Sequence, residues 1–193
     1  LLSRDNGDLW DTGKKRSDQS IQVAYEGSSL RSRQKCFWKV MVWDEKDAQS
    51  KWSDISTWEM ALLDKAEWRA SWIEAPRIYD WTAEMAVIAK NQKTDPKKDF
   101  EPAPYLRKSF STSKTIKKAR AYVSGVGYYE FYINGSRVGD HVLDPTFTNY
   151  DKRVHYLTYD VSDLMVKGKN ALGILLGDGW YNMHSRAVWG FSQ

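Results

Sequence analysis

The sequence predicts an all-β protein built from two consecutive antiparallel β-sandwiches, and three observations predict this class. Short runs with hydrophobic residues at every second position recur along the chain, as expected of strands that bury one face. Aromatic residues, which favour strands, make up 14% of the 193 residues. Segments with the 3.6-residue period of an amphipathic helix are nearly absent.

The first sandwich is expected over residues 1–64. Its predicted elements are, in order, the strand Ile21–Tyr25, the strand Gln34–Trp43, the polar turn Asp44–Asp47 and the strand Thr57–Leu63. Short strands separated by turns at this spacing are typical of a small antiparallel sandwich. Only Leu9 and Trp10 suggest a strand before Ile21, so we expect this domain to be truncated at its start.

The second sandwich is expected over residues 65–193, opening with a connector at Lys65–Pro76 and a mobile loop at about residues 90–104. Its predicted strands are Tyr105–Phe110, Ala119–Ser124, Tyr128–Asn134, Arg137–Val142, Arg153–Tyr159 and Ala171–Leu176. One helical turn is also predicted, over Asp160–Val166, with Ser162 or Asp163 as its N-cap and Gly168 as its end. Because no closing strand follows Tyr181, we expect this sandwich also to be cut short.

The most specific local signal is Asn134-Gly135, which lies between two alternating runs. A type I′ hairpin turn needs positive φ at both central residues, and Asn-Gly meets that need at least cost. The same residues, with Ser136, match the acceptor pattern for N-glycosylation. The hairpin explains both Asn and Gly without a sugar, so we interpret the motif as a turn.

Composition and charge exclude several classes of protein. Basic and acidic residues are interleaved and the net charge is only +4, so no nucleic-acid partner is expected. No apolar run approaches the roughly 18 residues of a membrane span. Cys36 is the only cysteine and lies on a strand face, which predicts a buried, inert thiol and no disulfide. The glycines of Gly125-Val126-Gly127 precede a strand rather than a helix, which argues against a nucleotide site.

No catalytic residue or metal ligand is nominated. His141, His155 and His184 are too far apart for a local metal motif. Carboxylates are plentiful, but glycoside hydrolysis needs two of them about 5–9.5 Å apart, and sequence spacing cannot show that separation. No motif requires a cofactor.

Two polar and aromatic clusters are the candidate site for carbohydrate. The first cluster is Asn149, Tyr150, Asp151 and Arg153, and the second is Asp178, Trp180, Tyr181 and Asn182. Loops at one end of a sandwich that offer a ring face beside amide and carboxylate groups are what a sugar site requires. The same oxygen atoms could hold Ca²⁺. The alternative is that Trp180 and Tyr181 only close the end of the sandwich.

The second half of the chain resembles the N-terminal β-sandwich domain of bacterial α-L-rhamnosidases, glycoside hydrolase family 78. The matching segments are Tyr122–Gly139 (YVSGVGYYEFYINGSRVG), Leu143–Asp160 (LDPTFTNYDKRVHYLTYD) and Asn170–Tyr181 (NALGILLGDGWY). The segment Trp38–Leu63, leading to Trp68–Ile73, is similar to the fibronectin-III-like module that precedes that domain. The resemblance implies a fibronectin-III- or Ig-like sandwich followed by a jelly-roll-like one. Where the family commonly has Trp, Phe147 stands here.

The resemblance also implies a function for the parent polypeptide, an inverting hydrolase that removes terminal α-L-rhamnose from glycosides. The family's catalytic acid and base lie on a C-terminal (α/α)₆ barrel, so this chain is expected to be a non-catalytic N-terminal fragment. Its implied partners are that catalytic domain and, through it, rhamnose-containing glycosides. Some relatives carry a rhamnose-binding module that uses Ca²⁺. The single cysteine fits a bacterial cytoplasmic or periplasmic protein and does not exclude secretion. The expected location is bacterial periplasmic or secreted, with a cytoplasmic one as the alternative.

Two other classes of function stay open at this point. One is a free-standing carbohydrate-binding, lectin-like module. The other is a purely structural interaction module whose aromatic surfaces dock other domains.

Overall fold

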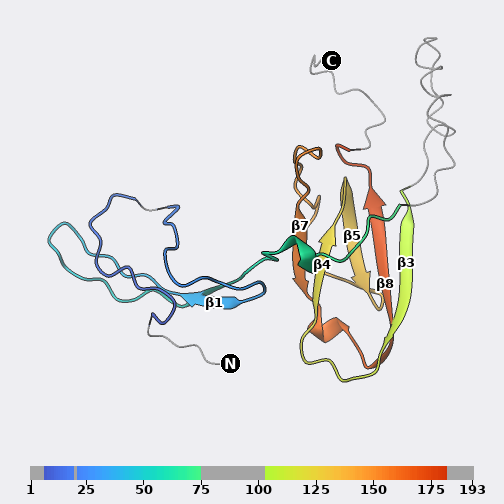
Figure 1. The fold of residues 1–193 in the computed structure, drawn as a ribbon, viewed down its shortest axis with the longest axis horizontal. Coiled ribbons are helices and arrows are strands. Elements are labelled where there is room, and N and C mark those ends of the chain that lie inside the picture. Colours follow the sequence, from blue (N-terminus) through green and yellow to red (C-terminus); the bar gives the residue numbers. More distant parts are fainter. Residues whose placement is uncertain (1–6, 20, 75–102, 182–193) are drawn as a thin grey trace, which may run out of the picture. The chain divides into compact units, whose positions relative to one another are not determined.

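The computed structural model describes residues 7–19, 21–74 and 103–181 (Figure 1). Within these residues the regular elements are β-strands and two single 3₁₀ turns, and every strand pair is antiparallel. The predicted all-β class is therefore confirmed. None of the helical turns in the described part of the chain is long and apolar enough to cross a membrane. Nearly all of the loop expected at about residues 90–104 lies outside the described residues.

The chain divides into two compact units, Leu1–Trp72 and Ile73–Gln193. The first unit contains a two-stranded sheet of β1 (Lys35–Trp38) and β2 (Ser56–Glu59), with Cys36 opposite Trp58. Cys36 is 1% exposed and is the only fully buried residue among those described in this unit. Burial raises the pKa of its thiol, which fits the prediction of an inert cysteine.

The predicted strand Gln34–Trp43 is wrong beyond Trp38, because serine hydroxyl groups interrupt the ladder. Val40 N–H donates to Ser53 Oγ at 3.0 Å, while Ser53 N–H donates to the Val40 carbonyl at 2.9 Å. Val42 and Ser50 repeat this exchange. Chain segments joined through side-chain hydroxyls lie side by side without forming a regular sheet.

The predicted strand Ile21–Tyr25 is also wrong. Gln22 adopts a φ of 57°, which turns the chain out of the extended conformation. Tyr25 instead holds a loop together: its ring meets Trp10 edge-on at 5.3 Å, and its hydroxyl donates to the Ser28 carbonyl at 2.8 Å.

The connector after β2 begins with a 3₁₀ turn, η1 (Lys65–Glu67), that is fastened to the turn before β1. Asp64 and Glu67 form a reciprocal capping box. The Glu67 carboxylate also accepts hydrogen bonds from the Ser32 hydroxyl and from Arg33 Nη1, the latter at 2.7 Å. These contacts tie the start of the connector to the first unit.

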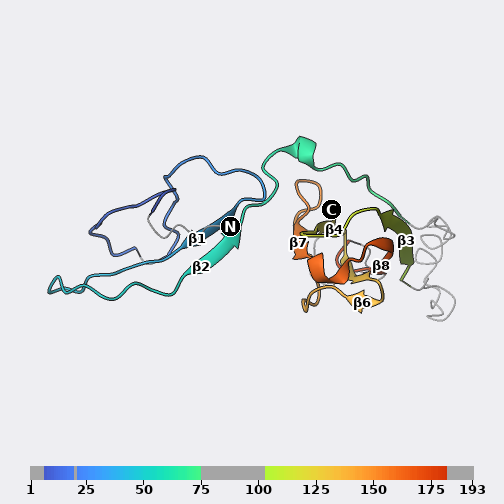
Figure 2. The same cartoon turned by 90° about the horizontal axis from the view of Figure 1, so that it is seen from below.

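The second unit is a two-layer sandwich. One layer is a four-stranded sheet in the order β3 (Tyr105–Thr112), β8 (Gly168–Gly177), β5 (Tyr128–Ile133), β6 (Ser136–Arg137), and the other pairs β4 (Arg120–Ser124) with β7 (Tyr156–Asp160). Figure 2 shows the pair β4 and β7 apart from the strands β3, β8 and β6 of the other layer. Tyr129, Phe131 and Ile133 alternate inward from β5 and pack with Val138 and Val161 to form the core between the layers.

The Asn134-Gly135 hairpin forms as predicted, with φ values of 51° and 87°. The side-chain amide of Asn134 also makes three hydrogen bonds to residues outside the turn. Its Nδ2 donates to the Leu164 carbonyl at 2.8 Å and to Asn170 Oδ1 at 2.9 Å, and its Oδ1 accepts from Ala171 N–H at 2.9 Å. The hairpin is thereby tied to β8 and to the 3₁₀ turn η2 (Ser162–Leu164).

Two boundaries of the second unit differ from prediction. The expected strand Arg137–Val142 shortens to β6, because Gly139 turns at a φ of 74° and lies so close to the Tyr159 ring that a Cβ there would be 2.9 Å from it. The expected strand Arg153–Tyr159 begins only at Tyr156, because the chain turns at residues 150–152 and pairs with β4 only from Tyr156 onward.

The predicted caps of the helical turn are wrong. Val161 occupies the N-cap of η2 without a side-chain hydrogen bond. The Ser162 hydroxyl donates to Asp160 Oδ1 at 2.6 Å and accepts from Ala119 N–H at 2.9 Å. Gly168 begins β8 at a φ of 103° and does not end the turn.

Candidate functional site

A compact turn places the first predicted cluster at one end of the sandwich. The Asn149 carbonyl accepts from the N–H groups of Lys152 and Arg153, both at 3.0 Å, and its side-chain Oδ1 accepts from Asp151 N–H at 3.2 Å. The Thr148 hydroxyl closes the turn by donating to the Arg153 carbonyl at 2.6 Å. Asn149 therefore shapes this turn, while Asp151 and Arg153 are exposed on it.

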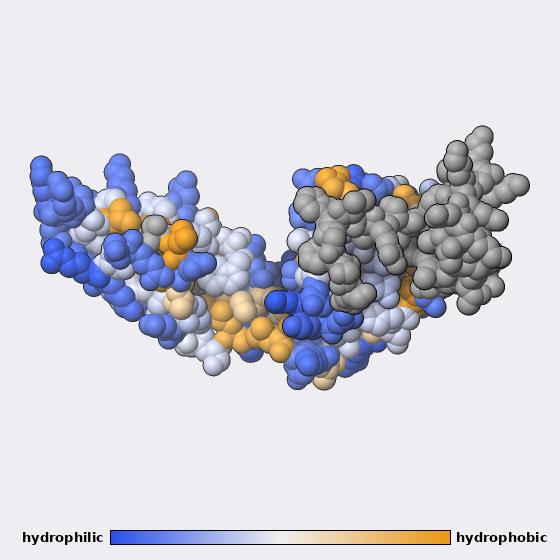
Figure 3. Space-filling model, turned by 90° about the horizontal axis from the view of Figure 1, so that it is seen from above, coloured by the Kyte–Doolittle hydropathy of each residue, from blue (hydrophilic) through white to orange (hydrophobic). Residues whose placement is uncertain are grey.

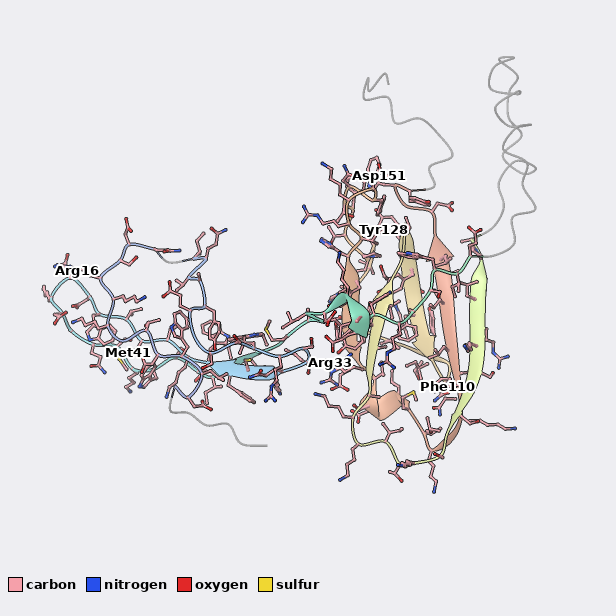
Figure 4. The ribbon with its side chains drawn as sticks, in the orientation of Figure 1. Arg16, Arg33, Met41, Phe110, Tyr128 and Asp151 are labelled. Carbon is pink, nitrogen blue, oxygen red and sulfur yellow. The ribbon has the colours of Figure 1, made fainter. Side chains whose placement is uncertain are left out.

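Two glycines bring the second cluster to the same end. Gly127, at a φ of 101°, lies so close to the chain after β8 that a Cβ there would be 2.6 Å from the carbonyl oxygens of Gly177 and Asp178. Gly179, at a φ of 55°, packs in turn on Gly127. Only glycine permits this approach. The loop that carries Trp180 is thus fixed against the start of β5, and Tyr128 and Asp151 lie toward the same end of the unit (Figure 4).

The two clusters meet through their rings. Phe147 lies edge-on to Tyr150 at 5.5 Å and tilted toward Trp180 at 5.9 Å, and Tyr150 meets Tyr181 edge-on at 5.6 Å. Aromatic pairs at these distances and angles are mutually attractive. We call Phe147, Tyr150, Trp180 and Tyr181 the aromatic rim.

The aromatic rim is a surface feature rather than part of the core. Phe147, Trp180 and Tyr181 are 56%, 49% and 57% exposed, and Tyr150 is half-buried. Hydrophobic side chains also reach the surface of the first unit, where they are interspersed with hydrophilic ones (Figure 3). The rim differs because its rings contact one another and form one continuous group.

The structure thus unites Tyr150, Trp180 and Tyr181 from two separate predicted clusters and adds Phe147, which was not among the predicted site residues. The position of Phe147 in the family motif was the available signal. Asp178 is half-buried in the loop before Trp180. Asn182 and His184 lie outside the described residues.

The described residues contain no group of three His, Cys, Asp or Glu side chains that could hold a metal ion. His141 Nδ1 lies 2.6 Å from Asp144 Oδ2, and His155 is exposed on the segment before β7. What the rim offers chemically is ring surface, with the side chains of Asp151 and Arg153 exposed on the turn that carries Tyr150. Such a surface suits contact with a sugar or with another protein domain.

Two family descriptions match the chain. Residues 1–64 match "Rha78A-like, N-terminal immunoglobulin domain", and residues 114–191 match "Alpha-L-rhamnosidase N-terminal domain". An α-L-rhamnosidase of Formosa agariphila is 38% identical over 189 residues, which cover 95% of this chain and 20% of that protein. One of an Alteromonas species is 38% identical over 178 residues, covering 92% of this chain and 18% of that protein.

Solved structures agree with these matches. The α-L-rhamnosidase from Dictyoglumus thermophilum superimposes with a TM-score of 0.71 at 43% identity, covering 91% of this chain and 19% of that one. The enzyme from Aspergillus terreus gives a TM-score of 0.61 at 32% identity, covering 86% and 18%. The chain therefore spans about a fifth of the length of the relatives it matches.

Proposed function

Because this chain comprises the immunoglobulin-like domain and the N-terminal domain of an α-L-rhamnosidase of glycoside hydrolase family 78, we propose that it braces the catalytic part of that enzyme. The activity proposed for the whole polypeptide is hydrolysis of terminal α-L-rhamnose from glycosides. The chain itself is proposed to be non-catalytic, with the C-terminal catalytic domain of the same polypeptide as its partner.

The aromatic rim carries this proposal. Exposed aromatic residues that contact one another are costly to leave in water, and Trp and Tyr are the residues that contribute most at protein interfaces. Trp180 and Tyr181 lie on the loop that follows β8, and the contacts between Gly127 and Gly179 fix that loop. A preorganised ring surface loses little conformational freedom when it docks, which favours binding to a fixed partner surface.

The proposal is tested first by activity. The 193-residue chain is expected to release no aryl group from an aryl α-L-rhamnoside, while the full-length polypeptide is expected to hydrolyse it. Measurable turnover by the chain alone would refute the non-catalytic assignment.

The bracing role is tested in the full-length polypeptide with Trp180→Ala. Truncation of a central interface Trp costs about 2 kcal/mol or more, so the melting transition of the catalytic domain is expected to fall. Trp52→Ala is the matched control, because Trp52 is similarly exposed, at 52%, but lies in the first unit outside the rim. A catalytic domain that melts at the same temperature with and without Trp180 would contradict the bracing role.

A second candidate function is direct carbohydrate contact at the rim, favoured by the exposed Asp151 and Arg153 on the same turn as Tyr150. Titration of the chain with L-rhamnose, with and without Ca²⁺ and followed by Trp fluorescence, tests it. Saturable binding that disappears in Trp180→Ala or Asp178→Ala would favour this function, and binding that appears only with Ca²⁺ would add a calcium site.

A further inference from the structure

Two glycines on the outer face of the four-stranded sheet are not required by the fold. Gly173 lies in the middle of β8 and Gly177 at its end, and neither has a left-handed backbone. A Cβ at Gly173 would meet only Tyr132 Cβ, at 3.6 Å, and one at Gly177 would lie 3.5 Å from Tyr128 Cβ, both ordinary contacts. Glycine inside a strand costs roughly 0.5–1 kcal/mol relative to alanine. Such a glycine often marks a bulge, a tight bend, or close approach by a ligand or another backbone.

The strand register places aromatic rings beside both glycines. Tyr128, Glu130 and Tyr132 point outward from β5, since the alternate residues of that strand fill the core. Their partners on β8 are Gly177, Leu175 and Gly173, respectively. Because glycine has no side chain, the backbone of the sheet is uncovered beside each of these two tyrosines.

Charged groups complete this outer face. The register places Arg107 of β3 across from Gly173, and Arg137 of β6 across from Tyr132. The Tyr132 hydroxyl donates to Glu130 Oε2 at 2.5 Å, and Arg137 Nη2 lies 3.5 Å from Glu130 Oε1. The hydrogen bond to Glu130 raises the pKa of Tyr132 and holds its ring in place.

We propose that this outer face, formed by Tyr128, Glu130, Tyr132, Gly173, Gly177 and Arg107, binds an oligosaccharide. Sugar rings lie over the two glycines against the tyrosine rings, while Glu130 accepts hydrogen bonds from sugar hydroxyls and Arg107 donates to them. Tyr128 and Tyr132 are four residues apart on one strand, or about 13 Å at ~3.3 Å per residue. That span requires a ligand of several sugar residues.

The composition of the face favours a glycan over a protein partner. Leu175 is its only aliphatic side chain larger than alanine between β3 and β5 in the described register. The large exposed hydrophobic residues of the second unit mostly lie elsewhere; they include Val142, Leu143, Phe147 and Trp180. Aromatic rings alternating with charged hydrogen-bonding groups match a ligand that has both C–H faces and hydroxyls. This face shares no residue with the aromatic rim, although Tyr128 lies against Gly179 in the loop that carries Trp180.

Calorimetric titration of the 193-residue chain tests the proposal, with an α-linked L-rhamnose tetrasaccharide, a β-linked glucose tetrasaccharide and free L-rhamnose as probes. At least one tetrasaccharide is expected to bind, and at least tenfold more tightly than the monosaccharide. Gly173→Ala is expected to weaken that binding about tenfold while the chain melts at the same or a higher temperature. Tyr132→Ala is expected to abolish it.

Trp180→Ala is the control that separates the two surfaces. Tetrasaccharide binding that survives Trp180→Ala, weakens about tenfold in Gly173→Ala and disappears in Tyr132→Ala supports the outer-face site. Absence of binding by both tetrasaccharides, or binding lost in Trp180→Ala and kept in Gly173→Ala, would overturn it without affecting the proposed bracing role.

Discussion

At the scale of single residues, the buried Asn170, hydrogen-bonded to the exposed Asn134, stabilises the second unit. Asn170 is 3% exposed, and its amide makes four hydrogen bonds. Its Oδ1 accepts from Val166 N–H and from Asn134 Nδ2, and its Nδ2 donates to the carbonyls of Val166 and Gly168. A buried polar network of this kind is favourable only while every member is satisfied.

Asn170→Leu is therefore expected to destabilise the second unit by about 3 kcal/mol, because it removes the partners of several buried groups at once. Urea denaturation followed by far-UV circular dichroism measures the change. Asn149→Ala is the control: Asn149 is exposed and its side chain accepts one local bond, so its loss should cost less than about 1 kcal/mol. Equal losses for the two variants would contradict the role given to the buried network.

Asp160 gives the second unit a dependence on pH. Hydrogen bonds from the Ser162 hydroxyl and the Ser162 N–H, together with Arg120 Nη1 at 2.6 Å, lower the pKa of its carboxyl. Because the folded pKa lies below the unfolded one, the stabilisation is fully present above the unfolded value of about 3.9. It is lost as pH falls through the folded pKa.

Asp160→Asn is accordingly expected to flatten the decline in stability of the second unit between about pH 5 and pH 3. Denaturation midpoints collected across this range provide the measurement. Asp163→Asn is the matched control, since Asp163 is an exposed carboxylate on the adjacent turn η2. A wild-type curve and an Asp160→Asn curve with the same slope would show that the carboxyl is not linked to folding.

At the scale of elements, the sequence predicted best where a residue type has one conformational role. Asn134-Gly135 specified its hairpin, and the apolar run from Ala171 specified the centre of β8. Strand ends were missed where side chains compete with the ladder, as Ser50 and Ser53 do beyond β1. They were also missed where an unpredicted positive φ turns the chain, as at Gln22.

The candidate site was predictable to a similar extent. Sequence spacing identified Tyr150, Trp180 and Tyr181 as loop residues with aromatic and polar neighbours. It could not show that two loops far apart in sequence share one ring cluster, because that depends on Gly127 and Gly179 letting the backbones touch.

The hairpin supplies a test at this scale. Gly135→Ala forces a side chain into a φ of 87°, which is expected to cost about 1–2 kcal/mol. Gly173→Ala is the comparison, because its backbone is not left-handed and the new methyl group would make ordinary contacts. Gly173→Ala should leave stability unchanged or raise it by about 0.4–1 kcal/mol. Chemical denaturation measures the free energy of unfolding of both variants. A loss of the same size at the two positions would contradict this interpretation.

At the scale of the whole molecule, the two units differ in how much core they bury. Among the described residues, the first unit fully buries Cys36 alone, whereas the second encloses a cluster centred on Tyr129, Phe131 and Ile133. Local stability follows the number of buried apolar contacts, so the units should open independently and with different free energies.

Amide hydrogen exchange measured by mass spectrometry checks this difference. Peptides from β1 and β2 are expected to exchange about a hundredfold faster than those from β5 and the centre of β8. Ile133→Ala, which removes core volume at a cost of about 2–5 kcal/mol, should accelerate exchange in β5 and β8 at least tenfold and leave β1 unchanged. If β1 and β2 were as protected as β5, or accelerated equally in Ile133→Ala, the chain would instead unfold as a single cooperative unit.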